Sequence, residues 1–151
     1  MDDILSLLQD FDVANFLPEP DKYLNSLEGW IRLIVLAGPL VLLGLGLWYY
    51  FAPPKEANHS AGFRNYWGMG SVEAWRFAQK LAGMGYTVLG GALTVIMLVV
   101  SLFFNGEKAL AMANAAVVCV AIELILTLAL WIVINALVYR AYDKDGNRRK
   151  K

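Results

Sequence analysis

The sequence predicts an all-α integral membrane protein with three transmembrane helices and short amphipathic helices at the membrane surface. Hydrophobic residues make up 58% of the 151 residues and charged residues only 17%, whereas soluble domains contain about 25% charged residues. The apolar residues are gathered in three long runs, at about 33–51, 84–104 and 110–139. Each run has the roughly 20 residues that a helix needs to cross a bilayer.

Residues 1–30 form an acidic segment ahead of the first run, and 7 of the 13 acidic residues lie within it. Leu7 and Leu8 share one helical face near the start, but the segment is too short and too acidic to cross a bilayer before Pro18 ends it. We therefore expect a helix that lies on the membrane surface, followed by a second short helix from Lys22 to Gly29.

The predicted membrane domain covers residues 31–142, and its first helix contains nineteen residues without a charge. Pro39 predicts a kink in this helix, because proline lacks the amide donor that a helix needs. In the second helix, Thr87, Thr94 and Ser101 recur every seven residues and form the kind of small, polar stripe that favours close helix packing. A short polar turn then returns the chain as the third helix.

Basic residues are distributed unequally between the two sides of these helices, with three on one side and ten on the other. The richer side contains the loop at 52–83 and the basic tail at 143–151. The positive-inside rule therefore places the loop and the C-terminus in the cytoplasm of a bacterial plasma membrane, with the N-terminus outside.

Glu123 is the one charged residue deep in a predicted span, and Thr127 shares its helical face. A carboxyl group at this depth should face the bundle, because exposure of its charge to lipid is costly. We expect the hydroxyl stripe of the second helix to lie opposite. Glu123 is either a proton or ligand site or a neutral carboxyl group that hydrogen-bonds across the bundle, and both interpretations remain open.

The loop carries most of the chemical variety of the chain. Its candidate binding residues, taken in order, are Asn58, Gly62, Phe63, Arg64, Ser71, Glu73 and Trp75. Arg64 is suited to bind a carboxylate or phosphate through two parallel hydrogen bonds, or to anchor to lipid phosphates. Ser71 should cap a short helix with Glu73 in its first turn. We expect this helix to lie along the membrane surface, with Trp75 facing the lipid.

At these residues the chain resembles the SdpI family of small bacterial membrane proteins. The resemblance covers about residues 33–142 and rests on Pro53-Pro54-Lys55, Asn58, Gly62-Phe63-Arg64, Met69, Ser71, Glu73-Ala74-Trp75 and Gly83. The chain departs from the family pattern at Phe63, Asn65, Gly68 and Gln79. The acidic N-terminal segment has no counterpart in the family core.

The family's named member is an immunity protein that protects its producer from a secreted toxic peptide and holds a repressor at the membrane. The resemblance implies a non-enzymatic protein that confers resistance to an antimicrobial peptide or docks a cytoplasmic regulator. The apolar spans and the basic tail indicate membrane lipids as further partners, and a transporter would need a second copy of the chain, because three helices alone enclose little space. A small proton-linked transporter built around Glu123, or a structural subunit of a membrane complex, is the alternative.

No other chemistry is indicated by the residue pattern. No nucleophile stands with a base and an orienting group, so we expect no catalytic residues. His59 has no second ligand at metal-binding spacing, and we expect neither a metal nor a cofactor, nor nucleic acid as a partner. The segment Asp143 to Asn147 resembles the start of a calcium loop but lacks the remaining ligands, so we interpret it as a turn.

Overall fold

The computed structural model describes residues 20–58, 60–104 and 109–149. In this part of the chain there are three long helices, α2 (Pro20–Phe51), α3 (Val72–Ser101) and α4 (Ala109–Ala141). All three are long and apolar enough to cross a membrane. The prediction of an all-α membrane protein with three spans is confirmed.

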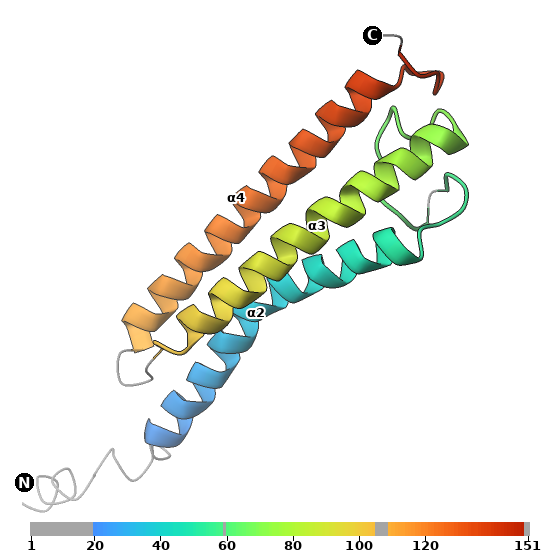
Figure 1. Cartoon of the computed structure of the whole chain (residues 1–151). Helices are drawn as coiled ribbons and strands as arrows, with labels where there is room; N and C mark the ends of the chain where they lie inside the picture. The colour runs from blue at the N-terminus through green and yellow to red at the C-terminus, as the bar shows by residue number, and fades with distance from the viewer. Residues whose placement is uncertain (1–19, 59, 105–108, 150–151) are drawn as a thin grey trace, which may run out of the picture.

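Figure 1 shows the loop between α2 and α3 at the same end of the bundle as the C-terminal segment, with the N-terminus of α2 at the opposite end. We call the end of the bundle that holds the loop and the C-terminal segment the loop end. It contains residues 52–71, the start of α3 and residues 142–149. The predicted surface helix within residues 1–17 and the predicted turn at 105–108 lie outside the described residues.

Two predicted short helices are continuous with the spans that follow them. The segment predicted to lead into the first span is the beginning of α2, and the segment after Ser71 is the beginning of α3. In α3, Trp75 is completely buried and does not face lipid. The structure therefore differs from the sequence prediction here, because Trp75 and the small residues beside it pack against the loop instead of the membrane surface.

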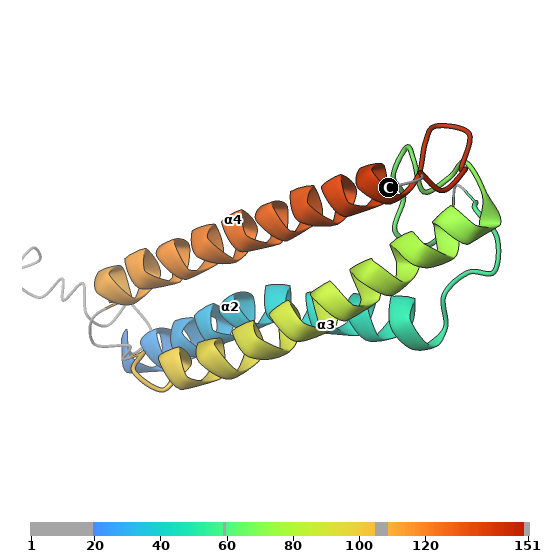
Figure 2. The ribbon, with the colours of Figure 1, turned by 45° about the horizontal axis from the view of Figure 1, so that its top comes forward.

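α2 and α3 pack against each other more extensively than either packs against α4, and both views show α4 set apart from this pair (Figures 1 and 2). Glycines permit the close approach. A Cβ atom on Gly90 would lie 2.5 Å from the backbone nitrogen of Leu43, and one on Gly83 would lie 2.7 Å from that of Tyr50. Small residues at such contacts let helix backbones pack directly in a membrane.

α2 contains Pro39 within its length, and Figure 1 shows the ribbon changing direction partway along this helix. Proline removes one amide donor from the helix and crowds the preceding turn, which produces a bend. The predicted kink is therefore present. It brings the part of α2 around Gly38 and Pro39 close to the middle of α4, where Glu123 lies.

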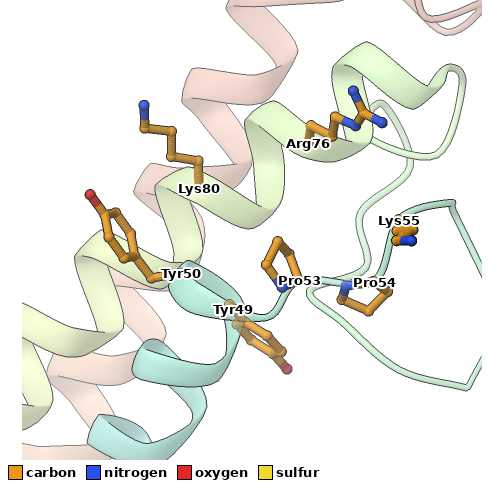
Figure 3. A pocket seen from close by; sticks show the side chains of 7 residues that line it. All are labelled: Tyr49, Tyr50, Pro53, Pro54, Lys55, Arg76 and Lys80. Carbon is orange, nitrogen blue, oxygen red and sulfur yellow. The ribbon is translucent and has the colours of Figure 1, made fainter.

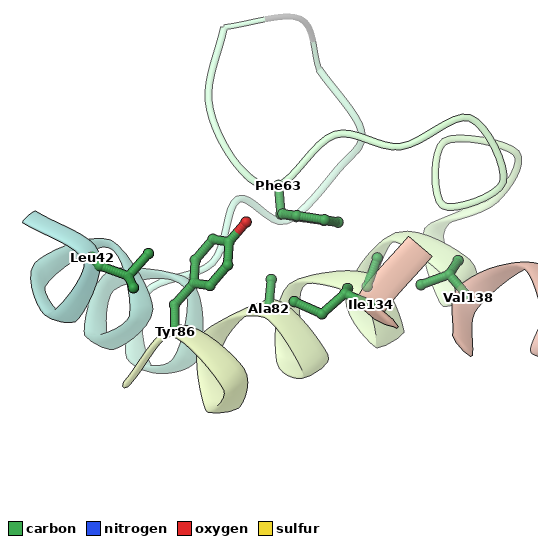
Figure 4. Close-up of a cluster of buried hydrophobic side chains, with 7 residues drawn as sticks. Leu42, Phe63, Ala82, Tyr86, Ile134 and Val138 are labelled. Atoms are coloured by element: carbon green, nitrogen blue, oxygen red, sulfur yellow. The ribbon is translucent and has the colours of Figure 1, made fainter. Parts of the chain in front are cut away.

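Buried side chains form one cluster near each end of the bundle. The cluster nearer the loop joins all three helices to the loop and contains Leu42, Phe63, Ala78, Ala82, Tyr86, Ile134 and Val138 (Figure 4). The other cluster includes Val35, Met97 and Met112. Beside it, the Arg32 guanidinium donates to Glu28 in the same helix and to the carbonyl oxygen of Phe104 at 3.3 Å.

Candidate functional site

Two side chains at the start of α3 hold the loop in place. The indole N–H of Trp75 donates to the carbonyl oxygen of Pro54 at 2.8 Å. One helical turn later, Gln79 pairs with the backbone of Phe63: its Oε1 accepts from the Phe63 N–H at 2.9 Å, and its Nε2 donates to the Phe63 carbonyl at 2.8 Å. Buried backbone groups need such partners, and Gln79 supplies both for a loop residue that forms no regular structure.

Gly62 places Phe63 for this pairing. Its φ angle is +100°, and a Cβ atom there would lie 2.7 Å from the Trp75 ring. Only glycine adopts this conformation readily and leaves room for the ring. Phe63 consequently turns its side chain into the bundle, where it is 5% exposed and packs edge-to-face against Tyr86, with ring centroids 5.9 Å apart. Figure 4 shows Phe63 reaching from the loop toward α3.

Two asparagines close turns within the loop. Oδ1 of Asn58 accepts from the backbone N–H groups of Ser60 and Ala61, and its Nδ2 donates to the carbonyl of Glu56. Asn65 is buried, and its Oδ1 accepts from the N–H of Gly68 at 2.6 Å. Its Nδ2 is buried without a partner among the described residues. Asn58 is thus occupied in shaping the loop, as its type favours.

Ser71 caps α3 as predicted, since its Oγ accepts from the N–H of Ala74 at 3.2 Å. The same hydroxyl donates to the carbonyl of Gly146 at 2.8 Å. Glu73 accepts a hydrogen bond from the Tyr142 hydroxyl at 3.1 Å. Burial, with the hydrogen bond and charge of Glu73, raises the pKa of the Tyr142 phenol, so Tyr142 remains a donor.

The C-terminal residues form a turn that packs on the start of α3. Tyr142 and Arg148 pair in an antiparallel bridge, and Gly146 at the turn has a φ angle of +77°. The Asp143 carboxylate accepts from the backbone N–H groups of Asp145 and Asn147. The predicted turn at Asp143 to Asn147 is present, but the segment lies against the protein and is more than a basic tail.

Arg64 and Tyr66 form the outward face of the loop, and both side chains are exposed. Tyr66 packs edge-to-face on Trp67, and Trp67 contacts Tyr139 of α4 with ring centroids 4.9 Å apart. The motif is therefore divided: Phe63 and Trp75 are buried and fix the loop, whereas Arg64 is exposed.

Sequence reasoning missed Gln79 and Tyr142 as site residues. Gln79 stands on the apolar face of its helix, between Ala78 and Ala82, and a polar side chain in that position signals a specific hydrogen-bond partner. Tyr142 gave no such signal, because its partner lies 69 residues away.

Glu123 lies beside a cavity of about 360 Å³ between the helices. Its side chain is 7% exposed, and its Oε1 is buried with no hydrogen-bond partner among the described residues. Oε2 faces α2, 2.7 Å from the position that a Cβ atom on Gly38 would occupy. Thr127 lines the same cavity, as do Pro39 of α2 and Leu93 of α3.

The hydroxyl stripe of α3 does not form the wall opposite Glu123, so this expectation is wrong. The Thr94 hydroxyl donates to the carbonyl of Gly90 in its own helix, and the Ser101 hydroxyl donates to Leu98. Thr87 lies against Gly46 of α2, and its hydroxyl has no partner among the described residues. Of these three residues, Thr87 packs against α2, the helix with which α3 forms the closer pair.

In the described part of the chain, no three or more His, Cys, Asp or Glu side chains lie close enough together to bind a metal ion. The site is therefore made of hydrogen-bonding, aromatic and basic groups. Arg64 contributes a guanidinium, a group that binds carboxylates and phosphates.

The chain matches a family model over residues 55–138, which include most of the loop, all of α3 and most of α4. The model describes the SdpI/YfhL protein family. No curated protein and no solved structure is similar enough to the chain to match it. The family match covers more than half of the chain and includes Arg64, Ser71, Trp75 and Glu123, so the chain belongs to the SdpI/YfhL protein family.

Proposed function

We propose that the chain is a non-enzymatic immunity or signalling protein of the bacterial plasma membrane, and that the outward face of its loop docks a cytoplasmic regulator. The division of the loop motif carries this proposal. Trp75, Gln79 and Gly62 fix the loop, so that Arg64 and Tyr66 are held on a rigid surface. A rigid surface loses less conformational entropy on binding than a flexible one.

The charge distribution supports the orientation in this proposal. Ten basic residues stand on the side of the loop and the C-terminus, against three on the other side. The positive-inside rule assigns the basic side to the cytoplasm. An epitope tag at residue 2 should be accessible in intact cells. A tag that is accessible only after permeabilisation would overturn the orientation.

The function is tested by expressing the chain in a peptide-sensitive host, followed by challenge with antimicrobial peptides. Arg64→Ala should abolish protection, and Arg64→Lys should restore little of it, because lysine cannot form two parallel hydrogen bonds. Arg140→Ala, which removes an exposed cation from the end of α4, is the matched control and should keep protection. Equal protection by wild type and Arg64→Ala would contradict the proposed role of the loop.

The cavity at Glu123 favours one alternative, a small proton-linked carrier. A buried carboxyl group without a partner inside a membrane is a common mark of a proton or ion pathway. The carrier would show a pH-dependent flux in proteoliposomes that Glu123→Gln abolishes and Arg64→Ala leaves intact. Protection that survives in Glu123→Gln but not in Arg64→Ala would instead favour the immunity and signalling role.

A further inference from the structure

A basic pocket lies where the end of α2, the loop and the first turns of α3 meet. It has a volume of about 470 Å³, and its charged residues are Lys55, Arg76 and Lys80. None of the described residues that line it is acidic. These three side chains form no hydrogen bond or ion pair with another described residue. Figure 3 shows Arg76 and Lys80 projecting from α3 and Lys55 beside the turn at Pro53 and Pro54.

Backbone contacts fix the positions on the chain from which the three basic side chains project around the pocket. Arg76 and Lys80 are four residues apart on α3 and therefore share a face of the helix. Lys55 follows Pro54, whose carbonyl oxygen accepts the hydrogen bond from buried Trp75. At Gly83, α3 touches the backbone of Tyr50 at the end of α2. The pocket thus depends on the same contacts that fix the loop.

The pocket lies beside the end of α2 and close to Met84, where the sequence predicts that the second span begins. α2 ends at Phe51, and Lys80 lies one helical turn, about 6 Å, before Met84 in α3. Below Lys80 on the same face, Met84 and Val88 are 40% and 73% exposed. Cations at the rim and exposed apolar side chains beneath them match an amphiphile with an anionic head and a hydrocarbon tail.

We propose that this basic pocket binds the phosphate headgroup of an anionic phospholipid, with an acyl chain along Met84 and Val88. Free phosphate would use the three cations alone, whereas a lipid would use the cations and the apolar stripe together. Lys80, which lines the pocket, is followed on the same face of α3 by the exposed Met84 and Val88, and this succession favours the lipid. Arg64 and Tyr66, on the outward face of the loop, are not among the residues that line this pocket.

Native mass spectrometry of the full chain in neutral detergent tests the proposal. Phosphatidylglycerol should remain bound at concentrations where phosphatidylcholine does not, and inorganic phosphate at the same concentration should not displace it. Replacing Lys55, Arg76 and Lys80 by Gln should weaken phosphatidylglycerol binding on the order of 100-fold, since each base near a membrane surface contributes about fivefold. The matched control replaces Arg140, Lys144 and Arg148, and should bind as wild type does.

Three results would overturn the proposal: equal retention of both phospholipids, displacement by inorganic phosphate, or equal loss of binding in the control variant. The melting temperature of each variant without lipid shows whether it folds. If the triple variant does not fold, the single variants Lys55→Gln and Lys80→Gln decide the question. Each should reduce phosphatidylglycerol binding about fivefold, and unchanged binding in both would also overturn the proposal.

Discussion

At the loop end, the side-chain amide of Gln79 and the indole N–H of Trp75 meet backbone groups, whereas in the membrane-spanning part Oε1 of Glu123 and the Thr87 hydroxyl meet no partner among the described residues. Asn65, whose Nδ2 is unpaired, is the exception at the loop end. A buried polar group with partners stabilises the fold, and one without partners costs stability. Side chains of the first kind therefore stabilise the loop, whereas the unpaired Oε1 of Glu123 lowers stability.

Breaking the loop end should have the largest effect. Trp75→Ala removes a fully buried ring and its hydrogen bond to Pro54, so we expect the free energy of unfolding to fall by about 3–5 kcal/mol. Denaturant titration in detergent, followed by circular dichroism, measures this loss. Tyr66→Ala is the control. Tyr66 is 71% exposed, and its replacement should change stability by about 0.5 kcal/mol or less.

Gln79→Leu isolates the polar part of the same contact. The N–H and carbonyl of Phe63 would stay buried without partners, which should lower the free energy of unfolding by about 2–4 kcal/mol. Denaturant titration in detergent again measures the loss. Lys80→Gln, at the exposed neighbouring position, is the control and should change the free energy of unfolding little. A loss of stability no greater for Gln79→Leu than for Lys80→Gln would mean that the pairing with Phe63 does not stabilise the loop.

A pair of glycines in α2 tests how closely this helix packs against α3. A Cβ atom on Gly46 would collide with the backbone of Thr87, whereas one on Gly44 would meet nothing within 4 Å. Gly46→Ala should therefore cost about 1–3 kcal/mol. Gly44→Ala should be neutral or stabilise the helix by up to about 1 kcal/mol. Thermal unfolding in detergent compares them, and equal melting temperatures would show that α2 and α3 do not touch at Gly46.

Glu123→Met should change stability in the opposite direction from the substitutions at the loop end, which lower the free energy of unfolding. It removes a buried carboxyl group and leaves no partner unsatisfied among the described residues, so stability should stay the same or rise by about 1 kcal/mol. The denaturant midpoints of the Glu123→Met and Gln79→Leu proteins, each compared with that of the wild type, measure this difference in stability. A loss of more than about 2 kcal/mol would mean that Glu123 has a hydrogen-bond partner in the bundle.

The smallest effect concerns the turn at Asp143. Hydrogen bonds, first of all from the backbone of Asn147, lower the pKa of this carboxyl group. A lowered pKa means that the ionised group stabilises the turn above the usual carboxyl pKa of about 3.9, and that this stabilisation is lost as the pH falls through the folded-state value. The pH-dependent shift of the amide NMR signals of Asp145 and Asn147 should therefore have its midpoint below the usual carboxyl pKa of about 3.9. Titration at or above this value would contradict the hydrogen-bonded turn.

The sequence was sufficient to predict local features. Three apolar runs predicted the three spans, Ser71 followed by Glu73 predicted a helix cap, and Pro39 predicted the bend in α2. Each of these depends on neighbouring residues or on the length of one segment. For the same reason, the turn at Asp143 to Asn147 could be recognised from its residue types.

Contacts between distant segments were not predictable in this way. The start of α3 has an amphipathic pattern, which indicates burial of one face but not whether lipid or protein covers it. Here Phe63 of the loop covers the side that was assigned to lipid. Likewise, the wall opposite Glu123 depends on the bend at Pro39 and on which helices pair most closely, and a single sequence states neither.

The hydrogen bonds from Ser71 to Gly146 and from Tyr142 to Glu73 also have a mechanical consequence. α4 has 33 residues, about 50 Å of helix, which exceeds a hydrocarbon core of about 30 Å. Such a helix adapts to bilayer thickness by tilting. With its C-terminal end fastened to the start of α3, α4 cannot tilt there alone. When bilayer thickness changes, the tilting of α4 would therefore also move the start of α3, and through Trp75 it would change the position of Arg64.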